Sequence, residues 1–202
     1  MTRVRKAAFG TAVALLAAGV VSVPAASAAD IVLPFTDYKV AGSLTVKKLN
    51  QSITLPPGST FNGSANLTTQ QLSGNVFIPE FTSTVRVLGI PTQVTTKLDQ
   101  VQPVQGTVSL DSNFNVHLRS TTTALLRIKK LRLGLLGVPT TCRTAEPILL
   151  TLDYDGPLVY PLAFNGTTTI PRLTGCGLLG PTLGSLLSGP GNAYHVEISP
   201  PS

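Results

Sequence analysis

The chain has 202 residues, of which 43% are hydrophobic, 12% are charged and 5% are aromatic, and its formal net charge is +6. It contains no Trp and only two His. The scarcity of stacking residues and of dense basic clusters excludes nucleic acid as an expected partner, and the absence of Trp disfavours a carbohydrate site.

The first segment predicts a secretory signal peptide over residues 1–29. Three basic residues lie within the first six positions, and an uncharged apolar run covers 7–23. Small residues then offer a cleavage site after Ala28 or Ala29, so that basic head, apolar middle and small-residue exit occur in the expected order. A retained membrane anchor is the alternative, but the run reaches only the lower limit of about 17 residues for a spanning helix.

Removal of this leader defines the exported chain, residues 30–202, which we expect to form a single domain. Of the 15 Lys and Arg residues, three belong to the leader, so 12 remain against nine Asp and Glu. The net charge of the exported chain is therefore +3, which gives little indication of a polyanion-binding surface. We expect the protein to be secreted, or associated with the cell envelope, with no transmembrane segment in the mature chain.

Composition predicts an all-β fold. Thr and Val are abundant, and their branched Cβ atoms suit a pleated strand better than a helix. Gly and Pro recur along the chain, as short strands separated by turns require, and Pro56–Gly58 marks one sharp break. We expect a β-sandwich or an open barrel of eight to ten strands, with one disulfide and a short C-terminal helix.

Three segments show the alternation of a strand with one buried face. They are residues 82–90, 105–110 and 114–120, in which apolar and polar side chains occupy alternate positions. Asp111–Asn113 separates the last two and predicts a hairpin loop.

The segment 125–133, "LLRIKKLRL", alternates with one interruption. Lys129-Lys130 shifts the phase between Ile128 and Leu131, as a β-bulge does. Its four cations could form a basic stripe, but the solvent-facing side of a strand is the favoured interpretation.

The two cysteines, Cys142 and Cys176, predict one disulfide, because an even number of cysteines in an exported chain most simply forms bridges. No metal site is expected. Asp153 and Asp155, in the predicted turn after the apolar strand 147–152, resemble the start of a calcium loop but lack its further acidic ligands.

The stretch "GCGLLG", residues 175–180, matches the G-x-G-x-x-G pattern of a dinucleotide site. Such a site needs a strand before it and a long helix after it, whereas only 22 residues follow Gly180 and further glycines interrupt them. We therefore expect no nucleotide or other cofactor. The glycines are expected to allow a tight turn around the disulfide, and leucines between 179 and 187 to line a short helix against the core.

No catalytic constellation is identifiable, so the protein is not expected to be an enzyme. His117 and His195 each fall on the polar side of an alternating segment, 114–120 and 193–199. No G-x-S-x-G motif accompanies them, although a hydrolase built on one histidine stays a minor alternative.

The tail "TGCGLLGPTLGSLLSGPGN", with "VPTTCRT" upstream and the Ala-rich leader, resembles exported actinobacterial proteins of unknown function. The resemblance covers about the last 65 residues and implies a disulfide-bridged, β-rich envelope or extracellular protein. It assigns no activity, so it implies no catalytic residue.

The sequence thus predicts an exported, non-enzymatic β-protein that acts by structure or interaction at the cell envelope. The alternative is a carrier of a lipid or another apolar ligand in a barrel cavity, since apolar strands can line such a space. Neither the partner nor the ligand is identified by the residues.

Overall fold

A computed structural model describes residues 29–87, 89–133 and 136–201. Their order is β1 (Val32–Val46), β2 (Gln51–Thr54), β3 (Thr60–Asn66), β4 (Gln71–Phe77), β5 (Phe81–Val87), β6 (Ile90–Leu110), β7 (Asn115–Leu133), β8 (Leu136–Thr144), β9 (Ile148–Pro157), β10 (Leu162–Ile170), β11 (Leu173–Thr174), η1 (Gly177–Leu179), α1 (Gly180–Leu187) and β12 (Gly189–Ser199). The predicted all-β class with a short C-terminal helix is confirmed. The predicted signal peptide, apart from Ala29, lies outside the described residues.

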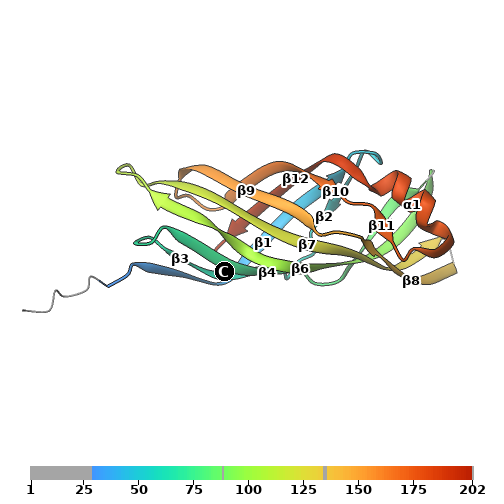
Figure 1. Ribbon diagram of the computed structural model, residues 1–202, viewed down its shortest axis with the longest axis horizontal. Coiled ribbons are helices and arrows are strands. Elements are labelled where there is room, and N and C mark those ends of the chain that lie inside the picture. Colours follow the sequence, from blue (N-terminus) through green and yellow to red (C-terminus); the bar gives the residue numbers. More distant parts are fainter. Residues whose placement is uncertain (1–28, 88, 134–135, 202) are drawn as a thin grey trace, which may run out of the picture.

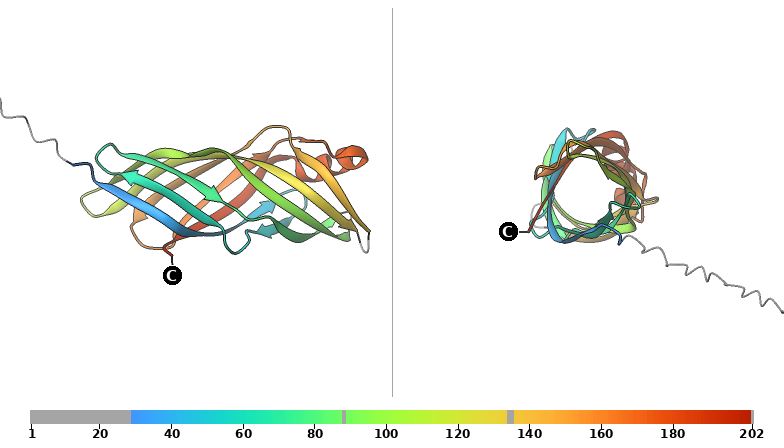
Figure 2. Two further views of the ribbon diagram at one scale, coloured as in Figure 1. Left: turned by 90° about the horizontal axis from the view of Figure 1, so that it is seen from below. Right: turned by 90° about the vertical axis from the view of Figure 1, so that its left-hand side faces the viewer.

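The strands form one antiparallel sheet that curls into an elongated barrel (Figures 1 and 2). Its main path is β10-β12-β1-β3-β4-β6-β7-β8-β11, and β9 pairs with β7. The remaining seam lies between β9 and β10, where the Thr168 hydroxyl donates to the Leu149 carbonyl at 2.6 Å. Seen along its long axis in Figure 2, the sheet surrounds the interior on all sides. The sandwich alternative is therefore replaced by the barrel.

The two longest strands, β6 and β7, run along the barrel and show how the sequence sorts its side chains. In β7, Val116 and Leu118 are buried, whereas His117 and Arg119, which alternate with them, are exposed. The register shifts opposite Lys129, which confirms the predicted bulge and keeps both Ile128 and Leu131 inside.

Two aromatic side chains inside the barrel lie against glycines of neighbouring strands. A Cβ added at Gly74 would come within 2.4 Å of the Phe61 ring, and one at Gly166 would come within 2.3 Å of the Tyr194 hydroxyl oxygen. The missing side chains at these two positions provide the space that the rings occupy.

Local predictions had mixed outcomes. The hairpin at Asp111–Asn113 is confirmed, because the Asp111 carboxylate accepts hydrogen bonds from the backbone of Asn113 and Asn115 at 2.8 Å. The turn predicted at residues 153–158 is wrong, because β9 continues to Pro157 and pairs with β7 over its whole length. The described residues form twelve strands, whereas eight to ten were predicted. The prediction was too low because β2 and β11 are too short to show alternation.

The C-terminal helix α1 lies at one end of the barrel, as Figure 1 shows. Leu183 is 5% exposed and packs with a cluster of buried side chains that includes Val85, Ile128 and Leu131. The disulfide between Cys142 in β8 and Cys176 connects the segment before α1 to the sheet, and confirms the predicted pairing. No helix in the described residues is both long and apolar enough to cross a lipid bilayer.

Candidate ligand-binding cavity

The barrel interior contains a cavity of about 160 Å³. Its wall is made of inward-facing side chains from most of the strands, including Phe35, Phe61, Leu118, Leu152 and Phe164. Every one of these is hydrophobic, because inward positions alternate with polar outward positions along each strand. The interior therefore favours an apolar occupant.

Four polar side chains in this wall, Gln100, Ser120, Thr122 and Thr168, are hydrogen-bonded to the protein. Gln100 accepts from the backbone of Val76 at 2.9 Å and donates to the Thr122 hydroxyl at 3.0 Å. The Ser120 and Thr168 hydroxyls donate to backbone carbonyls of β9. Because these groups are paired within the protein, they offer little to a polar ligand.

A second cavity of about 70 Å³ continues the interior toward α1. Four side chains line both spaces and separate them: Leu44, Leu55, Leu98 and Ile148. Leu183, Leu186 and Leu187 of α1 close the far side of this second space. The two apolar cavities therefore lie one after the other along the barrel and are separated by these four aliphatic side chains.

An aromatic cluster lies against the first cavity on the side of the β9–β10 loop. The Tyr38 ring lies 5.1 Å from that of Phe35 and 5.8 Å from that of Tyr160, measured between centroids. Burial, together with the Tyr38 hydroxyl, raises the pKa of Tyr160 to about 12, so this phenol is neutral at physiological pH.

His117 belongs to an ionic cluster on the outer surface. Its Nδ1 lies 2.8 Å from Oδ1 of Asp155, and its Nε2 lies 3.8 Å from Oδ2 of Asp111. Arg119 pairs with the second oxygen of Asp155. Hydrogen bonds from Arg119, and then from His117, hold the pKa of the Asp155 carboxyl below its ordinary value. Both ring nitrogens thus face carboxylates, an arrangement that orders the surface of β7 and β9 without positioning a nucleophile.

His195 lies on β12, also on the outside. Its Nδ1 is 2.7 Å from Oδ1 of Asn165, and its Nε2 is 3.1 Å from Oε1 of Glu197. In the described parts of the chain, no hydroxyl is hydrogen-bonded to either imidazole, and no group of three or more His, Cys, Asp or Glu side chains is arranged to hold a metal ion.

The "GCGLLG" stretch forms a turn, as the sequence predicts. Gly175 and Gly177 have positive φ angles of 73° and 55°, which favour glycine, and α1 that follows has only eight residues. The preceding strand β11 has two residues and pairs in antiparallel fashion with β8. The strand–turn–long-helix unit of a dinucleotide site is therefore not formed.

Comparisons with protein-family models, curated proteins and solved structures found no match to this chain. The resemblance of the tail to exported actinobacterial proteins therefore stays a prediction. From the sequence, a barrel cavity for an apolar ligand was predicted only as an alternative, and none of its lining residues was predicted. The alternation of apolar and polar residues could have identified the inward-facing side chains. It could not have identified the cavity, because that space lies between strands that are far apart in the sequence.

Proposed function

We propose that this protein is exported and binds a slender apolar molecule, such as an acyl chain, inside its barrel. The observation that carries the proposal is the cavity of about 160 Å³, lined mainly by hydrophobic side chains and continued by a second one of about 70 Å³. An unfilled space of this size in a core costs stability, because its lining atoms lose their contact partners. An apolar ligand would restore these contacts.

The dimensions also indicate the shape of the ligand. An engineered cavity of about 150 Å³ lined by Leu, Ile and Phe holds one benzene molecule. The larger space here accommodates a group of similar cross-section but no bulky ring system. Because the second cavity lies in line with the first, behind Leu44 and Leu98, a chain-like ligand fills both when those side chains shift.

The first test is to extract the natively purified protein with organic solvent and to analyse the extract by mass spectrometry. The proposal expects a stoichiometric apolar compound. The delipidated protein should then bind a rod-shaped apolar fluorophore such as diphenylhexatriene, and the extracted compound should displace it.

Variants locate the site. Ala124 lines the cavity, and Ala124→Phe places in it a ring that nearly fills a space of this size. Thr121→Phe adds the same ring on the exposed face of the same strand and is the matched control. We expect at least tenfold weaker fluorophore binding for Ala124→Phe and none of this loss for Thr121→Phe.

Ala124→Leu is the milder variant, used where the Phe variant melts at a much lower temperature. A clean extract combined with no fluorophore binding would refute the proposal. So would equal binding by the folded Ala124 variants and the wild type.

A further inference from the structure

The charges of the protein are strongly segregated along the barrel axis. Three segments build the end that carries α1: residues 81–98, 120–145 and 171–191. Together they contain eight cations and no Asp or Glu: Arg86, Lys97, Arg127, Lys129, Lys130, Arg132, Arg143 and Arg172. Three acids directly border these segments: Glu80, Asp99 and Glu146. Asp99 pairs with Lys97 at 3.1 Å and with Arg127 at 2.5 Å, so these two cations are partly neutralised.

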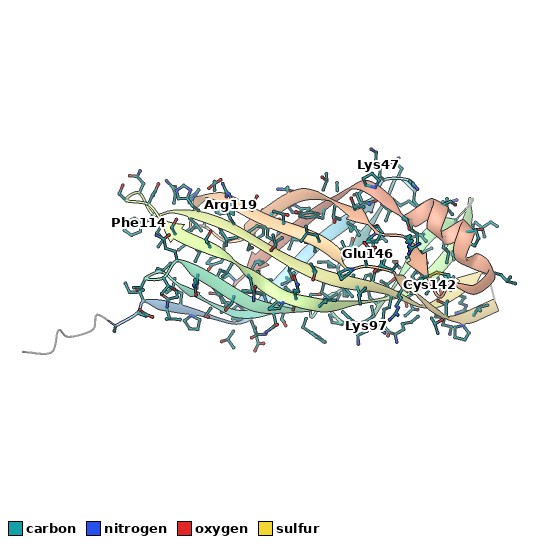
Figure 3. All side chains as sticks on the ribbon, in the orientation of Figure 1. Lys47, Lys97, Phe114, Arg119, Cys142 and Glu146 are labelled. Carbon is teal, nitrogen blue, oxygen red and sulfur yellow. A yellow bond between two sulfur atoms is a disulfide. The ribbon has the colours of Figure 1, made fainter. Side chains whose placement is uncertain are left out.

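Strand pairing places these cations beside one another although they are far apart in the sequence. Lys97 on β6 is opposite Arg127 on β7, which is in turn opposite Arg143 on β8. Closer to the end, Lys130 is opposite Pro139, and Arg132 is opposite Gly137. Figure 3 shows Lys97 on the outside of the barrel, next to the end that holds Cys142. The sequence showed only the cations of one strand, whereas the fold adds those of its neighbours.

Exposed hydrophobic side chains lie at the same end. Leu178 in η1 is 100% exposed, Ile90 at the start of β6 is 53% exposed, and Val138 in β8 is 48% exposed. Val138 pairs with Leu131, between the positions opposite Lys130 and Arg132, so apolar and basic groups are interleaved. We call Ile90, Val138, Leu178 and the exposed Arg86, Lys129, Lys130, Arg132 and Arg143 the basic tip.

The opposite half of the barrel has the reverse charge. Asp37, Asp111, Asp153 and Asp155 lie there, together with Lys39 and Arg119 as its basic residues in the described part of the chain. The barrel therefore carries a separation of charge along its length, and a negatively charged surface attracts one end and repels the other.

We propose that the basic tip docks on the surface of a membrane that contains anionic lipids. Cations attract such a surface, and each Lys or Arg near it strengthens binding about fivefold. The exposed Leu178, Ile90 and Val138 enter the boundary between headgroups and acyl chains, as apolar residues flanked by cations do in interfacial proteins. A hydrophilic polyanion would satisfy the cations but would leave these apolar side chains in water.

The experiment measures binding to vesicles of phosphatidylcholine with and without phosphatidylglycerol, by co-sedimentation at low and at physiological salt. The chain beginning at Ala29 is used, because it contains all strands that the structure describes and lacks the apolar segment 7–23, which would itself bind lipid. We expect binding that requires phosphatidylglycerol and weakens with salt.

Two pairs of variants separate the tip from the rest of the surface. Leu178→Asp and Lys130→Glu change exposed side chains of the tip, and each should weaken binding about tenfold. Phe114→Asp changes a side chain that is 74% exposed at the other end, and Lys39→Glu repeats the charge change there. These two controls should bind vesicles as the wild type does.

Equal losses in the control variants, or wild-type binding by both tip variants, would overturn the proposal. Weaker vesicle binding by Lys130→Glu but not by Leu178→Asp, with strong binding to soluble polyglutamate, would replace the membrane by an anionic polymer. The vesicles and the interior fluorophore report on separate surfaces, so the failure of one proposal leaves the other measurable.

Discussion

Opening the disulfide should destabilise the fold by roughly 3–4 kcal/mol. Cys142 and Cys176 are separated by 34 positions. In the chain-entropy account, closing a loop of this length removes roughly 3–4 kcal/mol of conformational freedom from the unfolded state. The free energy of unfolding is measured by urea denaturation for oxidised wild-type protein, reduced wild-type protein and the Cys142→Ala/Cys176→Ala variant.

Reduced wild-type protein is the control, because it opens the loop but keeps both sulfur atoms. Cys142 is 1% exposed, so its truncation also removes packing and should make the variant less stable than the reduced wild type. The oxidised–reduced difference isolates the loop. A difference below about 1 kcal/mol would refute the reasoning, since the open chain would then be as restricted as the bridged one.

Two further predictions concern α1 and the surface cluster. Gly184 lies inside α1 with nothing within 4 Å of an added Cβ, so Gly184→Ala should raise the free energy of unfolding by about 0.5–1 kcal/mol; a loss in urea denaturation would contradict this. Arg119→Met should raise the pKa of Asp155 toward its ordinary value, because it removes the largest cause of the lowering, and carboxyl NMR titration checks this. Because the pKa of Asp155 is lower in the folded than in the unfolded protein, this carboxylate stabilises the fold above its unfolded pKa, and that stability is lost as the pH falls through its folded pKa. The free energy of unfolding of the variant should therefore depend less on pH in the acid range. An unchanged pKa of Asp155 in the variant would contradict this prediction.

The sequence predicted those features that depend on neighbours in the chain. Alternation around Val116 and Leu118 identified a strand with one buried face, and the phase shift at Lys129 identified the bulge. The turn at residues 153–158 was placed wrongly because Asp, Gly and Pro favour turns locally, whereas pairing with β7 keeps the backbone extended to Pro157. Tertiary pairing outweighed local preference there.

What the sequence could not provide depends on pairing between distant segments. Ala124 and Leu44 line one cavity because β1 and β7 lie on the same barrel, and no local pattern indicates this. Likewise, Arg127 and Arg143 come together only through the register of β7 and β8. Both candidate sites are therefore products of topology.

The interior and the basic tip are built from the same strands, and the two-residue period keeps them apart. In β7, Ile128 and Leu131 face inward toward the cavity near α1, while Lys130 and Arg132 face outward at the tip. Substitutions of outward-facing residues can therefore test the tip while the cavity lining keeps its own side chains. The two surfaces meet where η1 runs into α1, because Leu183 of α1 closes the inner cavity while Leu178 of η1 is fully exposed. A membrane bound at the tip would thus lie against the element that closes the apolar interior.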